Sequence, residues 1–331
     1  MIQTIFILTA GLGLAQSSPI RAPSTTCTLS NGTASVELYW DPIAKPVNDS
    51  RCTYQGGAKC NLKGWLYTPK ITGDKIFATF PVVVFNHGSG KENDEICAIA
   101  DYFTRQGVSV FAPLRRGHRD ANGQFQNTGI HLDEYLSQLS IGQKDKGEVQ
   151  YLKSQVAELK DSLRYLDLSQ SRLRIDPARM AIMGHSFGGS LVLFAASEPL
   201  SPRPKAVVDI SGAVLEWDRN KCWHDPLSES VGSRRMPIFF FQPTNESSHN
   251  PTFVLSKVAG TTGDEMFQSA FFPPVLPRPG ECIIPNDTTG NCAAVGQLIN
   301  HKIHARFVTD HIHVNVWGPA VLEFLQRNGF N

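Results

Sequence analysis

From residue 62 onward, short apolar runs alternate with longer segments in which apolar residues recur every three or four positions. Continuous apolar runs of four to eight residues are typical of strands buried on both faces, and the longer periodic segments are typical of amphipathic helices. The alternation of the two patterns predicts an α/β fold, with a mostly parallel central sheet flanked by helices in a single domain.

The predicted strands share apolar runs that end at turn residues. They cover residues 62–69, 81–85, 108–113, 179–186, 205–211, 236–242 and 266–274. The predicted helices share the three- and four-residue recurrence of apolar positions. They cover residues 95–106, 149–168, 187–197, 253–259 and 317–329. In the last of these helices, Pro319 is expected near the first turn, where its missing N–H costs nothing.

The first residues form an apolar run from Ile5 to Leu14, followed by small and polar residues. The run is too short to span a bilayer. It predicts a signal peptide over residues 1–18, cleaved after Ala15 or a few residues later, and hence a secreted, extracellular protein. The alternative interpretation is a buried N-terminal strand. Residues 19–61 are then an N-terminal extension that contains a strand, and the main domain covers residues 62–331.

Cysteine usage and glycosylation sequons agree with export. The seven cysteines all lie beyond the predicted leader, at positions 27, 52, 60, 97, 222, 282 and 292. Cys52 and Cys60 bracket one short loop, and Cys282 and Cys292 bracket another within a Pro- and Gly-rich insertion near 275–300. Local disulfides within each loop are the expected pairing, although sequence does not fix the connectivity. Sequons for N-glycosylation stand at Asn31, Asn48, Asn245 and Asn286.

Charge excludes one class of partner. The chain carries 31 basic and 30 acidic side chains, a formal net charge of +1, with no run of like charges. A nucleic-acid-binding protein would show a basic face, so no nucleic-acid partner is expected. No membrane-spanning segment is predicted either, and the oligomeric state is left open.

The candidate nucleophile lies between a predicted strand and a predicted helix. Gly184, Ser186 and Gly188 match the G-x-S-x-G nucleophile elbow, which requires a strand, a sharp turn and a helix in that order. Small neighbours are needed because the serine occupies a strained turn where larger side chains would collide. The pattern indicates a serine hydrolase with Ser186 as its nucleophile.

A second motif follows the buried strand 81–85. The sequence Asn86-His87-Gly88-Ser89-Gly90 is typical of a loop that supplies one amide to an oxyanion hole. The amides of Gly88 and of Phe187, the residue after the nucleophile, are the predicted donors. His87 is expected to organise this loop rather than to carry a proton.

These motifs resemble the dienelactone-hydrolase-like branch of the α/β-hydrolase superfamily. The matching stretches are residues 82–90, 115–118 (RRGH), 175–189 (IDPARMAIMGHSFGG), 236–246 and 317–325. The resemblance implies an α/β-hydrolase fold with a triad in the chain order serine, acid, histidine. Relatives commonly have an Asn-Asp pair after the strand that corresponds to 236–242, and this pair falls on Asn245 and Glu246. Glu246 is therefore the candidate acid; the alternative is a solvated surface glutamate.

Four histidines are candidates for the base, and no Gly-His pair of the family type distinguishes them. They are His301, His304, His311 and His313. The resemblance favours His304, followed by His311 and then His301. The four histidines form two pairs close in sequence, His301 with His304 and His311 with His313, which also suggests a metal site. No carboxylate or cysteine framework at zinc spacing accompanies these pairs. We therefore expect no metal and no cofactor.

The resulting functional hypothesis is a carboxylic ester hydrolase that acts through an acyl-enzyme on small-molecule esters. Two alternatives remain at this point. One is a small peptidase of the same fold, and the other is a non-catalytic, hydrolase-like binding protein.

Overall fold

The computed structural model describes residues 27, 29, 34–40, 62–70, 78–89, 96–118, 130–246, 248–261, 267–275 and 303–331. Several sequence predictions lie outside the described residues. They are the signal peptide, the Cys52/Cys60 and Cys282/Cys292 disulfides, the insertion beyond Val275, the sequons at Asn31, Asn48 and Asn286, and His301.

The described strands form one eight-stranded sheet. They are β1 (Ala34–Trp40), β2 (Leu62–Thr68), β3 (Phe80–Asn86), β4 (Ser109–Leu114), β5 (Ile175–His185), β6 (Val207–Ile210), β7 (Ile238–Pro243) and β8 (Phe267–Phe272). Their spatial order is β1-β2-β4-β3-β5-β6-β7-β8. The six strands from β4 to β8 in this order are parallel, whereas β2 is antiparallel to both β1 and β4. The predicted α/β fold with a mostly parallel sheet is confirmed.

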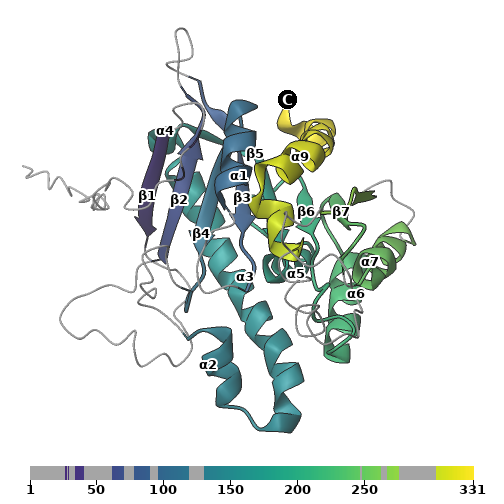
Figure 1. Ribbon diagram of the computed structural model, residues 1–331. Coiled ribbons are helices and arrows are strands. Elements are labelled where there is room, and N and C mark those ends of the chain that lie inside the picture. The colour runs from purple at the N-terminus through teal and green to yellow at the C-terminus, as the bar shows by residue number, and fades with distance from the viewer. Residues whose placement is uncertain are drawn as a thin grey trace, which may run out of the picture.

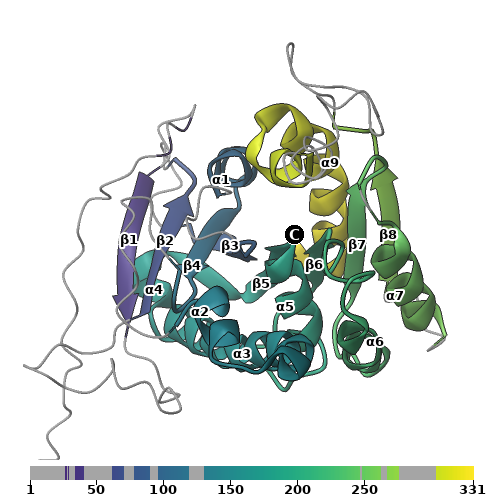
Figure 2. The ribbon, with the colours of Figure 1, turned by 60° about the horizontal axis from the view of Figure 1, so that its bottom comes forward.

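Helices cover both faces of the sheet. They are α1 (Ile96–Arg105), α2 (Leu132–Ser137), α3 (Lys144–Leu168), α4 (Gln170–Leu173), α5 (Phe187–Ala195), α6 (His224–Gly232), α7 (Asn250–Gly260) and α9 (His311–Leu325). Helices α1 and α9 lie on one face, and α3, α5 and α6 lie on the other (Figures 1 and 2). The structure is therefore a three-layer α/β/α domain.

The central strand β3 shows how the sequence pattern forms two cores. Its side chains are buried throughout and alternate between the faces of the sheet. Val82 and Val84 pack with the residues of α3 and α5, while Val83 and Phe85 pack with those of α1 and α9. A strand buried on both faces requires the uninterrupted apolar run that the sequence shows.

Two helix starts differ by five or more residues from the sequence predictions, and α2, α4 and α6 were not predicted. Helix α3 begins at Lys144, five residues before the predicted start at Val149. Helix α9 begins at His311, so Pro319 lies inside the helix and the prediction of a first-turn proline is wrong. The physical reason is a cap: the Asp310 side chain accepts a hydrogen bond from the Ile312 N–H at 2.9 Å and begins the helix earlier.

The N-terminal extension is tied to the domain in two ways. Strand β1, which lies in the predicted extension, pairs along its length with β2. Cys27 forms a disulfide with Cys97 on α1. This pairing was not anticipated from sequence, and Cys222 is the one free thiol of the described residues. Among the described helices, none is both long and apolar enough to cross a membrane.

Candidate active site

Ser186 lies on a strained turn between β5 and α5. Its backbone has φ 56° and ψ −121°, a combination that residues other than glycine rarely adopt. The Ser186 N–H donates to the carbonyl of Ile210 at the end of β6, at 2.9 Å. The serine is therefore held at the carboxyl edge of the parallel strands, with the first turn of α5 directly behind it.

The flanking glycines are required by close backbone approach. A Cβ atom on Gly184 would lie 2.0 Å from the carbonyl oxygen of Gly188. A Cβ atom on Gly188 would lie 2.0 Å from the carbonyl oxygen of Asn86 and 2.5 Å from that of His87. The Gly-rich elbow thus lets α5 start directly against the loop that follows β3.

Glu246 and His304 lie in contact although 58 residues separate them. Glu246 follows β7, and His304 lies in a helical stretch at 303–309. Nδ1 of His304 is hydrogen-bonded to Oε1 of Glu246, and both side chains are almost fully buried. The His304 ring packs against the ring of His185, the neighbour of Ser186, with centroids 4.4 Å apart. Its Nε2 makes no hydrogen bond within the described part of the chain.

Two further side chains surround this carboxylate. Ser211, which follows β6, donates from Oγ to Oε2 of Glu246 at 2.6 Å. Asp209, on β6, is fully buried and accepts a hydrogen bond from the N–H of Gly212 at 3.0 Å. Burial raises the pKa of Asp209 to about 8, and the negative charge of Glu246 contributes to this rise. Asp209 is thus protonated near neutral pH.

The other candidate histidines are placed differently. The His311 side chain is 50% exposed at the start of α9, and its Nδ1 lies 3.5 Å from the Asp101 carboxylate on α1. His313 lies on the same helix, half-buried, and burial lowers its pKa. Of the three candidate histidines that the structure describes, His304 is the one that contacts Glu246.

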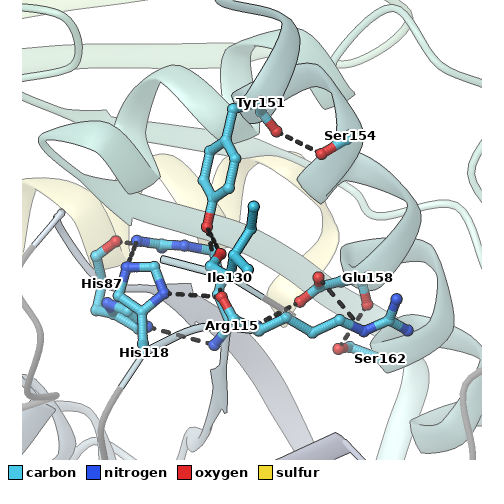
Figure 3. Close-up of polar contacts among 9 residues, drawn as sticks. His87, Arg115, His118, Ile130, Tyr151, Ser154, Glu158 and Ser162 are labelled. Atoms are coloured by element: carbon cyan, nitrogen blue, oxygen red, sulfur yellow. Dashed lines mark hydrogen bonds and ion pairs between the residues drawn. The ribbon is translucent and has the colours of Figure 1, made fainter. Parts of the chain in front are cut away.

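The loop after β3 lies beside the elbow and is held by a buried polar network (Figure 3). His87 interacts through Nδ1 with the carbonyl of Gly88 at 2.9 Å, and its Nε2 accepts from the Arg115 N–H at 3.4 Å. Burial, then the nearby Arg115 charge, lowers the pKa of His87 well below its usual value. The ring is therefore neutral, which agrees with the expected organising role.

Behind this loop the network continues to α3. The Arg116 N–H donates to Glu158 at 2.9 Å, and the two side chains form a buried ion pair. The Tyr151 hydroxyl donates to the carbonyl of Ile130 at 2.9 Å. Burial raises the pKa of Glu158 to about 7, although the Arg116 charge lowers it. These contacts fix the segment after β4 against α3.

Sequence reasoning did not assign roles to Ser211, Asp209 or Arg115. The RRGH stretch was noted for its resemblance alone, and nothing local marks a serine after β6 as a neighbour of a glutamate 35 positions later. No group of three metal-ligating side chains occurs among the residues that the structure describes.

The fold and the elbow define an α/β-hydrolase. The acetyl xylan esterase family model matches residues 36–224, more than half of the chain, and the chain belongs to this family. The name of this family is that of an esterase, which favours the enzyme hypotheses over a non-catalytic binding protein.

Individual relatives are distant. Platelet-activating factor acetylhydrolase of Canis lupus familiaris is 26% identical over 198 residues, which are 52% of this chain and 41% of that protein. The match thus spans less than half of the length of that relative.

An esterase from Thermogutta terrifontis superposes with a TM-score of 0.51 at 16% identity, covering 83% of this chain and 90% of that one. A Klebsiella pneumoniae protein described as a dienelactone hydrolase has a TM-score of 0.45 at 15% identity, covering 72% and 85%. The α/β-hydrolase fold that the sequence resemblance predicts is confirmed.

Proposed function

We propose that this chain is a serine carboxylic ester hydrolase in which Ser186, His304 and Glu246 form the catalytic triad. The contact between Glu246 and Nδ1 of His304, beside the elbow, carries this proposal. Because Glu246 engages Nδ1 of His304, Nε2 is the nitrogen that exchanges a proton with the nucleophile and the leaving group. Glu246 holds the ring in this tautomer and stabilises the imidazolium.

The reaction runs in two halves. Ser186 Oγ attacks the ester carbonyl while Nε2 of His304 takes the hydroxyl proton, and the amides of Gly88 and Phe187 stabilise the oxyanion. The alcohol leaves with the proton from His304. A water molecule, deprotonated by the same nitrogen, then attacks the acyl-enzyme, and His304 returns the proton to Ser186 Oγ as the carboxylic acid leaves. No cofactor enters either half.

The substrates we propose are short acyl esters, acetates above all. The family name and the name of the curated relative both specify removal of acetyl groups.

Hydrolysis of p-nitrophenyl acetate, butyrate and octanoate, with covalent labelling by a fluorophosphonate, tests the proposal. We expect the highest kcat/KM with the acetate, and Ser186→Ala should lose both labelling and all but a small residual rate. If Ser186→Ala keeps most of the activity, the proposed nucleophile is wrong. An optimum at octanoate would contradict the acyl-chain assignment and leave the triad standing.

We also propose that the protein is exported through the leader at residues 1–18. The sequons and the Cys27–Cys97 disulfide support this, because disulfides persist in oxidising compartments. N-terminal sequencing of protein from the culture medium of expressing eukaryotic cells tests it. A mature chain that starts between residues 16 and 20 is expected, whereas full retention of an intact Met1 inside the cells contradicts it.

A further inference from the structure

Arg115 touches both parts of the proposed oxyanion hole. This buried residue follows β4, and its guanidinium donates from one terminal nitrogen to the carbonyl of His87 (Figure 3) and from the other to the carbonyl of Gly88. The same guanidinium lies over the ring of Phe187, 5.7 Å from its centroid. The rigid fork of arginine suits two adjacent acceptors, which a lysine ammonium cannot hold in the same geometry.

Fixing these two carbonyls also fixes two amides. In a trans peptide the N–H points opposite to the C=O of the same plane. The carbonyl of His87 shares its plane with the N–H of Gly88, and the carbonyl of Gly88 shares its plane with the N–H of Ser89. Both carbonyls point toward Arg115, so both N–H groups point to the opposite side. Successive N–H groups that point to one side form an anion-binding concavity.

The loop that carries these two peptides adjoins the nucleophile elbow. The carbonyl of His87 would lie 2.5 Å from a Cβ atom on Gly188, so the peptide plane that carries the Gly88 N–H packs against the first turn of α5. That turn begins with Phe187, whose amide is the other proposed donor. The first N–H groups of a helix have no partner within the helix and are available to an anion.

The guanidinium of Arg115 also contacts His118. Its second terminal nitrogen lies 3.4 Å from Nε2 of His118, whose ring packs at 4.7 Å from that of His87. Nδ1 of His118 lies 3.2 Å from the carbonyl of Arg116. The segment 115–118 thus orients the guanidinium toward the loop through its own backbone and side chains.

We infer that Arg115 is a positioning residue of the esterase reaction, which holds the peptides of His87 and Gly88 so that the Gly88 and Ser89 amides face the developing oxyanion. This inference rests on the proposed function. It also adds the Ser89 amide to the donors predicted from sequence. Arg115 acts through the loop and never touches the substrate.

Kinetics of Arg115→Met, Arg115→Lys and the control Glu158→Gln test this inference. Glu158→Gln disturbs the same buried network at its Arg116 end and leaves the guanidinium of Arg115 in place. In Arg115→Met we expect kcat for p-nitrophenyl acetate to fall by about 10- to 100-fold with KM changed less than about twofold, because an oxyanion hole acts on the transition state. Arg115→Lys should recover part of the loss, and Glu158→Gln should keep kcat within about threefold.

Two additional readouts separate positioning from general damage. A trifluoromethyl ketone forms a serine adduct that carries the oxyanion. Its inhibition constant should increase in Arg115→Met by the same factor by which kcat/KM falls. Amide hydrogen exchange of a peptide covering residues 86–89 should accelerate in Arg115→Met but not in Glu158→Gln, while exchange in β5 stays unchanged.

The outcomes are distinct. If the parent hydrolyses the ester and Arg115→Met keeps its kcat, or if the ketone binds the variant as tightly as the parent, the inference is overturned and the proposed function stands. If the parent neither hydrolyses the ester nor reacts with the fluorophosphonate, the proposed function fails. In that case the hydrogen exchange of residues 86–89 still tests whether Arg115 holds the loop. Unchanged exchange in Arg115→Met would overturn this part of the inference as well.

Discussion

Ser211 donates a hydrogen bond of 2.6 Å to the carboxylate of Glu246, on the oxygen opposite to the one that meets His304. The two residues come from the ends of adjacent strands β6 and β7, and Ser211 has a positive φ of 53°. The Glu246 carboxylate is therefore held through both of its oxygens.

Removing this hydroxyl should slow catalysis. A hydrogen bond to a charged group contributes about 1.5–3 kcal/mol, and its loss leaves the carboxylate less well oriented toward the imidazole. We expect Ser211→Ala to lower kcat about tenfold with the fold intact, measured with p-nitrophenyl acetate. Ser190→Ala is the matched control, because it removes a buried hydroxyl on α5 that makes no hydrogen bond among the described residues. Equal rates in the two variants would show that Ser211 does not orient the acid.

The assignment of the base can be tested by comparing two histidines. His304→Ala should reduce hydrolysis by several orders of magnitude, because the proton acceptor next to the nucleophile is lost. His311→Ala should change it little, since that side chain is half-exposed and faces Asp101. If His311→Ala is inactive while His304→Ala remains active, the base is His311 and not His304. If both variants, together with His301→Ala and His313→Ala, remain as active as the parent, the triad is wrong.

The Asn245 sequon should stay unglycosylated. Its Nδ2 donates to the carbonyl of Val275 at 2.9 Å while its Oδ1 accepts from the N–H of the same residue at 3.0 Å. This two-point pairing uses the amide hydrogen on the same side as the carbonyl oxygen. A trans-linked sugar would take that position. Glycosidase treatment in ¹⁸O water converts a glycosylated asparagine to a labelled aspartate. Mass spectrometry should find Asn245 unconverted, and a labelled aspartate at this position would contradict the pairing.

Asp209 should make the folded state less stable as the pH rises. Its pKa of about 8 in the folded protein lies above the ordinary 3.8, so between these values the folded state binds more protons than the unfolded state. The resulting stabilisation is complete below the ordinary pKa and is lost progressively up to about pH 8. Asp209→Asn keeps the acceptor for the Gly212 N–H and removes the titration. Urea unfolding at several pH values should show a flatter profile in the variant, by up to about 1.36 kcal/mol per pH unit. Parallel profiles would argue against a buried protonated Asp209.

The contact between the elbow and the loop after β3 leaves no room for a methyl group. Gly188→Ala should cost about 1–3 kcal/mol of unfolding free energy and should also lower kcat, because the neighbouring atoms are backbone and cannot move independently. Gly142→Ala is the matched control, since nothing lies within 4 Å of its Cβ position. Thermal unfolding measures the first effect. A Gly188→Ala variant as stable as Gly142→Ala would contradict the close approach.

The parts of the fold that follow from local pattern were predictable from sequence. The apolar run of β3 and the strand–turn–helix signal around Ser186 need only neighbours in the chain, and both were located to within a few residues. The start of α9 was misplaced because Pro319 is typical of a first turn, whereas the cap at Asp310 begins the helix at His311, two turns before the proline.

The site beyond the nucleophile depends on contacts between distant segments, which no local pattern encodes. Four histidines lie within thirteen positions, and the packing of the stretch 303–309 against His185 separates His304 from the others. Ser211 lies next to Glu246 only because β6 pairs with β7, and Arg115 lies next to the loop after β3 only because β4 pairs with β3. The family resemblance indicates Glu246 and favours His304, whereas the contact of Ser211 with Glu246 is evident only in the folded chain.

The Cys27–Cys97 disulfide closes a covalent ring that contains β1, β2 and β3. Its two cysteines are 70 positions apart, and a ring of this size restricts the unfolded chain by about 4 kcal/mol in the chain-entropy account. The ring also changes what a protease can do. A single backbone cut between the two cysteines leaves both fragments joined and the edge strand still paired, so release of the N-terminal piece requires cleavage and reduction together.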